Sequence, residues 1–150
     1  MKRVALGIML GVSTLAGAVS AEDRISEAQR AKSQRYVTLS DECFAKKDLE
    51  CAYENARQAL RADPNSFDAY LNISTFHNRS REWYAAFEYA EKALLVAKSN
   101  DEKGDAYSNM SVACANLGDK AKARTYIREA IRLCPDESRY VQINARVSSD

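Results

Sequence analysis

The sequence predicts an all-α fold, an α-solenoid of three stacked helical hairpins followed by a C-terminal capping helix. One pattern of aromatic, small and apolar residues occurs three times along the chain. Within each copy the pattern has the i, i+3, i+4, i+7 spacing of one helix face. The composition agrees, because the 150 residues include only 5 glycines and 2 prolines, and 46% are hydrophobic.

Residues 1–21 have a different composition from the rest of the chain. Two basic residues stand at positions 2 and 3, an apolar stretch follows, and small residues lie at Val19 and Ala21 before an acidic pair. This order is typical of a secretory signal peptide, so we expect cleavage after Ala21 and a mature domain of residues 22–150. We therefore expect a bacterial protein exported to the periplasm. A secreted protein is one alternative. An uncleaved membrane anchor is another, since the apolar stretch is near spanning length.

The three copies keep a common register. Each has a tyrosine, a serine four residues later and two alanines in its second half, and successive copies are offset by 34 and then 37 residues. The repeated positions are Tyr36, Tyr70 and Tyr107; Ser40, Ser74 and Ser111; Ala52, Ala86 and Ala123; and Ala59, Ala93 and Ala130. Pro64 and Pro135 close the first and third copies. The predicted repeats span about 33–66, 67–100 and 104–137.

Turns are expected inside each hairpin, at residues 46–48, 78–80 and 117–119. Asp119 is a suitable N-cap for the last second helix, and Gly118 a suitable terminator before it. Residues 98–103 are interpreted as a lengthened loop between the second and third copies. Residues 138–147 are expected to form the capping helix, with Tyr140, Val141 and Ile143 on its apolar side, because a repeat array needs a terminal cap.

These motifs resemble those of the tetratricopeptide repeat family over about 100 residues. The repeated serines match its small residue on the first helix, and the repeated alanines match its small residues on the second. The opening tryptophan of the family is tyrosine here, and Lys98 stands where the second copy would have its proline. A generic array of helical hairpins is the alternative. The resemblance implies a non-enzymatic scaffold whose first helices line a concave, peptide-binding groove.

The composition gives little support for catalysis or nucleic-acid binding. Lys plus Arg number 22 and Asp plus Glu 21, so the bulk positive charge of a generic nucleic-acid binder is absent. His77 is the only histidine, and we expect it in the core rather than in a catalytic arrangement. We therefore expect no enzyme activity, no cofactor and no metal site. The partner is predicted to be a protein or peptide, without membrane insertion of the mature chain; the sequence sets no oligomeric state.

The four cysteines allow three full pairings. Cys43 and Cys51 lie on either side of the first predicted turn, so an antiparallel hairpin brings them level, and export implies an oxidising compartment. We expect a Cys43–Cys51 disulfide, and no bond between Cys114 and Cys134, whose mirror positions miss by about 16 Å of helix rise. The alternative is that all four cysteines are small core residues.

The resemblance also implies which residues line the groove. The candidates are Val37, Asp41, Phe44, Leu71, Asn72, Thr75, Asn109 and Val112. Co-chaperone members of the family hold a terminal carboxylate with a Lys/Arg/Asn clamp, but Asp41 and Asp105 stand at two of the clamp positions here and oppose an anion. Asn72 and Asn109 resemble the asparagine ladder that other members use to hold peptide backbone, because an amide both donates and accepts. The alternative is that both amides are simply solvated.

The second helix of the middle copy carries an aromatic cluster. Trp83 and Phe87 are expected to pack between helices, whereas Tyr84 and Tyr89 are expected to face outward.

The sequence as a whole predicts one of two functions. The first is a periplasmic scaffold that binds an extended segment of another envelope protein in its concave groove. The alternative is a structural subunit of an envelope assembly, docked through the convex aromatic face or the terminal helix.

Overall fold

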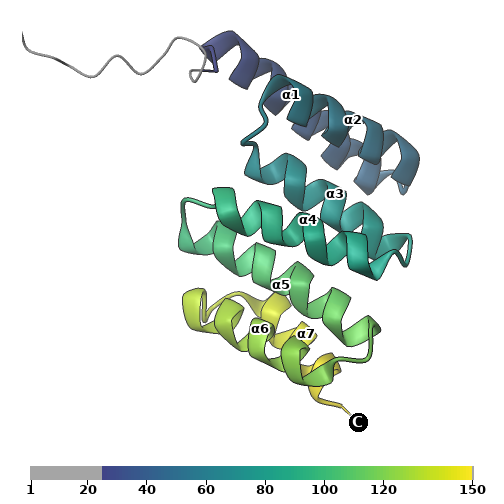
Figure 1. Ribbon diagram of the computed structural model, residues 1–150, viewed down its shortest axis with the longest axis vertical. Helices are drawn as coiled ribbons and strands as arrows, with labels where there is room; N and C mark the ends of the chain where they lie inside the picture. Colours follow the sequence, from purple (N-terminus) through teal and green to yellow (C-terminus); the bar gives the residue numbers. More distant parts are fainter. Residues whose placement is uncertain (1–24, 150) are drawn as a thin grey trace, which may run out of the picture.

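The computed structural model describes residues 25–149, which form seven α-helices and no strand (Figure 1). The helices are α1 (Glu27–Ala45), α2 (Leu49–Ala62), α3 (Phe67–Arg79), α4 (Trp83–Val96), α5 (Asn100–Asn116), α6 (Lys120–Leu133) and α7 (Ser138–Ser148). The first six pair as antiparallel hairpins, which stack along the longest axis of the molecule. The predicted fold class is therefore confirmed. The predicted signal peptide lies outside the described residues.

The repeated serines and alanines hold the two helices of each hairpin together. Ser40, Ser74 and Ser111 are fully buried, and each hydroxyl donates a 2.8 Å hydrogen bond to the carbonyl oxygen of an alanine on the second helix. The acceptors are Ala52, Ala86 and Ala123, themselves fully buried. Any larger side chain at these positions would push the two helices apart.

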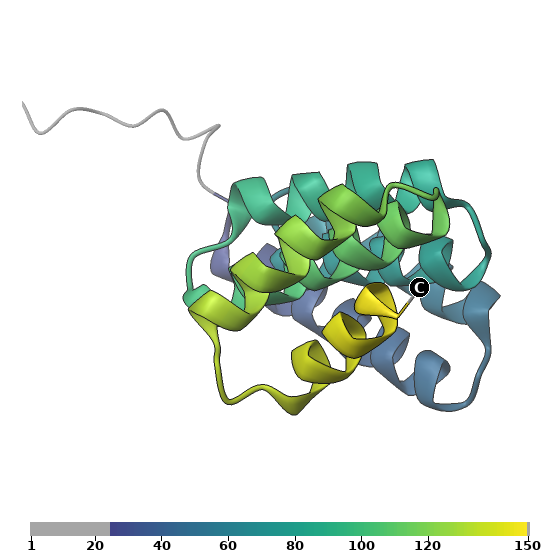
Figure 2. The same cartoon turned by 90° about the horizontal axis from the view of Figure 1, so that it is seen from below.

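Neighbouring hairpins join where a second helix packs on the next first helix. Ala59 of α2 contacts Ala69 of α3, and Ala93 of α4 lies in one cluster with Ala106 of α5. The third junction places Ala130 of α6 against Tyr140 of α7. Figure 2, seen from the C-terminal end, shows α6 and α7 in front of the remaining helices. Helix α7 thus occupies the place of a fourth first helix and caps the array.

The expected loop over residues 98–103 is wrong for residues 100–103, which are helical. Helix α5 begins at Asn100 with Ser99 as its N-cap. The Ser99 hydroxyl accepts from the Glu102 backbone N–H, while the Glu102 carboxylate accepts from the backbone N–H of Ser99 and of Lys98. This capping box satisfies the free donors of the first turn, so the extra residues between the copies lengthen the helix.

The three turns share one backbone feature. Lys47, Arg81 and Gly118 hold equivalent positions and have positive φ angles of 63°, 63° and 86°. The second turn follows Arg79, so it lies later than the predicted residues 78–80. Its N-cap, Glu82, makes no side-chain capping bond. Instead, its carboxylate accepts a 2.5 Å hydrogen bond from Nδ1 of His77, which draws the turn toward the core.

Helix α7 packs two of the three expected residues, Tyr140 and Ile143, against the array. Tyr140 and Val147 are buried, Ile143 is half-buried and Val141 is 53% exposed. Val141 was wrongly placed on the apolar side, because Tyr140, the neighbouring residue, turns into the space between α5 and α6. None of the helices within residues 25–149 is long and apolar enough to cross a membrane.

Candidate functional site

The first helices of the hairpins form one continuous row, in which α1 contacts α3, α3 contacts α5 and α5 contacts α7. We call the surface they present the first-helix face. A hollow of about 210 Å³ lies at its edge, where Gln34, Asp68 and Glu102 meet the segments that connect the hairpins, which contribute Asp63 and Lys98 among others. A second hollow, of about 190 Å³, lies between Val112 of α5 and Ile143 of α7. The face therefore offers one depression lined mostly by polar residues and one lined mostly by apolar residues.

The eight candidate groove residues differ in how far a ligand could reach them. Asp41 is exposed, and six others are half-buried: Phe44, Leu71, Asn72, Thr75, Asn109 and Val112. Val37 is only 3% exposed. Its assignment to the groove is wrong, because its side chain fills the junction between Ala59 and Ala69.

Two of the apolar candidates are also partly covered. The guanidinium of Arg79 lies over the Phe44 ring at 4.9 Å from its centroid. Leu71 packs against the cluster formed by Phe67, Ala93 and Ala106. Both side chains thus present only part of their surface to a ligand.

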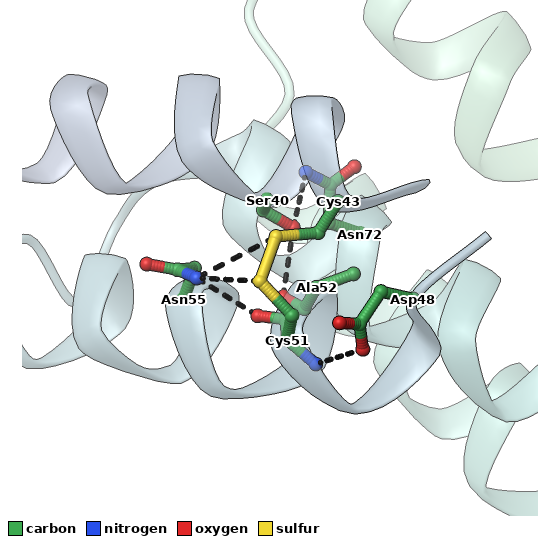
Figure 3. The surroundings of a disulfide bond; sticks show 7 residues. All are labelled: Ser40, Cys43, Asp48, Cys51, Ala52, Asn55 and Asn72. Carbon is green, nitrogen blue, oxygen red and sulfur yellow. Dashed lines mark hydrogen bonds between the residues drawn. A yellow bond between two sulfur atoms is a disulfide. The ribbon is translucent and has the colours of Figure 1, made fainter. Parts of the chain in front are cut away.

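The Asn72 amide spans the junction between the first two hairpins (Figure 3). Its nitrogen donates to Ser40 Oγ at 3.1 Å and to Asp41 Oδ1 at 2.8 Å. Ser40 has a single hydroxyl proton, which it gives to the Ala52 carbonyl, so it accepts from Asn72. This order of donors fixes the orientation of the amide and leaves its oxygen facing away from the junction.

Asn109 repeats the arrangement one hairpin further along. Its nitrogen lies 3.2 Å from Ser74 Oγ and 3.1 Å from Thr75 Oγ1, with the Leu71 carbonyl at 3.5 Å. No described residue donates to the side-chain oxygen of Asn109 or of Asn72, and neither oxygen is buried. The expectation that each amide is free to donate and accept is therefore wrong in its first half. The donors bind the preceding hairpin, and only the oxygens are available to a ligand.

Carboxylates gather where α1, α3 and α5 meet. Burial raises the pKa of Asp68 above its ordinary value, and the nearby charges of Asp41, Glu102 and Asp105 raise the same pKa further. Asp105 accepts a 2.5 Å hydrogen bond from the Tyr140 hydroxyl and pairs with Arg139. The sequence singled out Asp41 and Asp105 as acids that oppose an anion, and it did not give this role to Asp68 or Glu102. Asp68 and Asp105 are repeat equivalents, 37 residues apart, and that spacing is the signal that could have revealed the cluster.

The aromatic cluster of α4 is only partly exposed. Tyr84 is 80% exposed, as expected. The expected exposure of Tyr89 is wrong, because its ring stacks on His77 at 5.4 Å between centroids and lies 6.4 Å from the Tyr70 ring. Phe87 contacts the Tyr126 ring of α6, which is the inter-helix packing expected of it.

Cys43 and Cys51 come together across the first turn (Figure 3). Their Cα atoms are 5.7 Å apart, as a disulfide requires, so the pairing agrees with the sequence prediction. The Asn55 amide nitrogen lies beside both sulfurs and donates to the Cys51 carbonyl at 2.9 Å. Cys114 and Cys134 are not bonded to each other. Partial burial and a hydrogen bond to Asp101 raise the pKa of Cys134 to about 11, which leaves it an unreactive thiol.

No catalytic arrangement is visible around the single histidine. His77 is 8% exposed, packs on Tyr53, Phe76 and Tyr89, and binds the carboxylate of Glu82. It is therefore a core histidine with a satisfied ring nitrogen. Within residues 25–149, no group of three or more His, Cys, Asp and Glu side chains is placed to hold a metal ion.

These features define a helical-repeat protein with one continuous face of first helices. Residues 104–137, the third predicted repeat, match the family model described as tetratricopeptide repeat. Comparison with curated proteins found no match. The match and the solved structures together support the resemblance to tetratricopeptide repeat arrays, and the chain has their fold.

Three solved structures illustrate the similarity. The first TPR of Spaghetti (RPAP3) bound to an HSP90 peptide, SRMEEVD, has a TM-score of 0.71 at 17% identity, over 79% of this chain and 92% of that one. The second TPR domain of human RPAP3 with an HSP70 peptide has a TM-score of 0.68 at 16% identity, over 82% and 98%. The O-GlcNAc transferase of Thermobaculum terrenum has a TM-score of 0.75 at 14% identity; 81% of this chain covers 23% of that enzyme.

Proposed function

We propose that this chain is a non-enzymatic periplasmic scaffold whose first-helix face holds an extended segment of another envelope protein. The observation that carries the proposal is the pair of side-chain oxygens on Asn72 and Asn109, which occupy equivalent places and have no donor of their own. Each oxygen can accept a hydrogen bond from a peptide N–H whatever the side chain of that residue. Because the amides are fixed by the preceding hairpin, little order has to be gained on binding.

The negative charge of the first-helix face determines which peptide segments can bind there. Two of the similar structures hold peptides that end in Glu-Glu-Val-Asp. Here Asp41, Asp68 and Glu102 lie along the corresponding face, and they repel such a tail. We therefore expect a neutral or basic segment.

The test is a panel of fluorescein-labelled twelve-residue peptides, unrelated in sequence and differing in charge, titrated by fluorescence anisotropy. Neutral and basic peptides should bind, and peptides ending in Glu-Glu-Val-Asp should bind most weakly. Asn72→Ala combined with Asn109→Ala should weaken binding by about five- to a hundredfold, and by similar factors for different sequences, because each lost bond is worth about 0.5–1.5 kcal/mol.

A stability control is required, because both amides also join hairpins. Ser111→Ala removes the serine-to-carbonyl bond to Ala123 inside the third hairpin, and within residues 25–149 no asparagine donates to Ser111. It should lower the melting temperature without changing peptide affinity. Equal affinity of the asparagine variant and the parent would exclude the first-helix face as the binding site.

Export is tested separately by intact-mass measurement on protein from an envelope fraction. The expected mass lacks residues 1–21. A mass that includes these residues would favour the anchored alternative.

The alternative function, a structural subunit docked through the convex face, is supported by Tyr84. Its ring is 80% exposed and borders a hollow of about 390 Å³ that Phe87 and Leu117 also line. Under this alternative, a partner should co-purify with the parent protein in fixed ratio, and Tyr84→Ser should abolish this co-purification. The double variant Asn72→Ala with Asn109→Ala should still co-purify with the partner.

A further inference from the structure

At each junction between hairpins, a second helix packs on the same positions of the next first helix. We call this docking surface of a first helix the seat. Ala59 of α2 lies on Ala69 of α3, and Ala93 of α4 lies on Ala106 of α5. One turn further along these first helices, Ile73 is 1% and Met110 3% exposed. A first helix in this array is therefore shaped to receive a preceding second helix at these positions.

Helix α1 carries the same seat, and no described helix occupies it. Arg35, Tyr36 and Leu39 stand 34 residues before Ala69, Tyr70 and Ile73. Leu39 is 44% exposed, where its two counterparts are buried. The outer face of α1 is the side that points away from the other helices, and a shallow hollow of about 580 Å³ lies on it. The hollow is lined by Ala28, Ala31, Lys32, Arg35, Tyr36 and Leu39. The spacing of these residues forms one stripe along more than three turns.

The charge of the seat differs from that of the internal ones. Arg35 replaces an alanine that is fully buried in both other copies, and Lys32 lies one turn before it. Neither side chain forms an ion pair with any of residues 25–149. A helix seated here would cover two unpaired cations, which favours acidic side chains beside its apolar stripe.

We propose that the outer face of α1 docks an acidic amphipathic helix of a partner protein, in the place that a preceding second helix would fill. The contact is independent of the first-helix face, and the two surfaces can act on different partners. The small residues that α2 and α4 present to their own seats indicate that the partner helix also carries alanine along its stripe.

The chain supplies two probes of opposite charge. A synthetic peptide of residues 82–97 copies α4 and has three acidic residues against one basic residue. A peptide of residues 119–134 copies α6 and has five basic residues against two acidic ones. Each is labelled with a fluorophore and titrated with protein purified from cells that express the whole sequence. The 82–97 peptide should bind at least about tenfold more tightly than the 119–134 peptide, because the seat is basic.

Three variants locate the binding. Leu39→Asp should weaken the 82–97 peptide at least about tenfold, because a charge replaces an exposed apolar contact of the seat. Arg35→Glu should weaken the 82–97 peptide and strengthen the 119–134 peptide. Leu95→Asp is the matched control, since Leu95 is 85% exposed on α4, and it should change neither. Circular dichroism should show the same helical content for all three.

Several results would overturn the proposal. The first is that the Leu39→Asp variant binds the 82–97 peptide as tightly as the parent protein does. The second is that the parent protein binds both peptides with equal affinity. A dimer by light scattering that Leu39→Asp dissociates would assign the seat to a second copy of the chain. If intact mass shows that residues 1–21 are retained, and the peptide binds only after their removal, the seat is assigned to the N-terminal segment of the chain itself.

Discussion

A short chain of hydrogen bonds sets the stacking of this protein at the scale of single residues. The Asn109 amide donates to the Ser74 hydroxyl, which in turn donates to the Ala86 carbonyl. Asn72, Ser40 and Ala52 form the same chain in the preceding hairpin. One serine thereby closes its own hairpin and accepts a bond from the next, so intra-hairpin and inter-hairpin contacts depend on the same side chain.

Ser74→Ala should therefore cost more stability than Ser111→Ala. Both remove a buried hydrogen bond, which is typically worth about 0.5–1.5 kcal/mol, but only Ser74 also accepts from an asparagine. Urea denaturation followed by circular dichroism measures the difference. Equal losses in the two variants would show that the Asn109 bond contributes nothing to stability.

The sequence identified both asparagines from their equivalent positions, but it could not show what their amides bind. Periodicity places a residue on a helix face. It does not say whether a serine of the preceding hairpin lies within 3.2 Å, because that distance depends on how the hairpins stack. The burial of Val37 escaped prediction for the same reason.

At the scale of the elements, the three hairpins share a left-handed residue in their turns. Gly118 takes this conformation without a steric cost, whereas Lys47 and Arg81 carry a Cβ at the equivalent places. The turn is kept in all three copies, so the packing of the two helices, rather than the turn residue, determines its shape.

Gly118→Ala should destabilise the protein by about 1–2 kcal/mol, the cost of a left-handed alanine. Apart from its chain neighbours, no described residue has an atom within 4 Å of the Cβ that alanine would add, so the loss measures backbone strain rather than a clash. Arg81→Gly is the converse variant and should not destabilise by a comparable amount. Thermal unfolding of both tests the prediction, and an unchanged melting temperature for Gly118→Ala would contradict it.

The capping helix depends on a second glycine. A Cβ at Gly104 would lie 2.7 Å from the hydroxyl oxygen of Tyr140, whose ring is fully buried between α5 and α6. The glycine thus provides the space in which the tyrosine anchors α7.

Gly104→Ala should lower stability by about 1–3 kcal/mol, the usual cost of overpacking, and should increase amide exchange throughout α7. Tyr140→Phe removes the clashing oxygen together with its bond to Asp105. The double variant should therefore be more stable than the sum of the two losses predicts. Strict additivity would show that the two residues do not meet.

The two ends of the whole molecule are stabilised by different means. At the C-terminal end, α7 covers the last hairpin. At the N-terminal end no described helix covers α1, and the hairpin there carries the Cys43–Cys51 link instead. A repeat stabilised by one neighbour gains from a covalent link, because each hairpin depends on the contacts at its junctions.

Reduction should therefore act mainly on the first hairpin. Cys43 and Cys51 are 8 residues apart, and closing a loop of this length stabilises by about 2–3 kcal/mol in the chain-entropy account. Cys43→Ser combined with Cys51→Ser should lower the free energy of unfolding by this amount and increase amide exchange in α1 and α2 first. Denatured protein without reductant should show two reactive thiols. Four reactive thiols would exclude the link.

The sequence by itself determined the class of fold, the three hairpins, the C-terminal cap and the cysteine pairing. These follow from spacing within one helix, from a pattern repeated at offsets of 34 and 37 residues and from pairing across one short turn, and all three can be read without knowing how the hairpins stack. The tertiary structure alone decided that Val37 is covered, that the Asn72 and Asn109 donors are already used, and that Leu39 is exposed where Ile73 and Met110 are buried. Those facts depend on which helices lie against one another, because the position of a residue within its own helix does not say whether a neighbouring helix covers it.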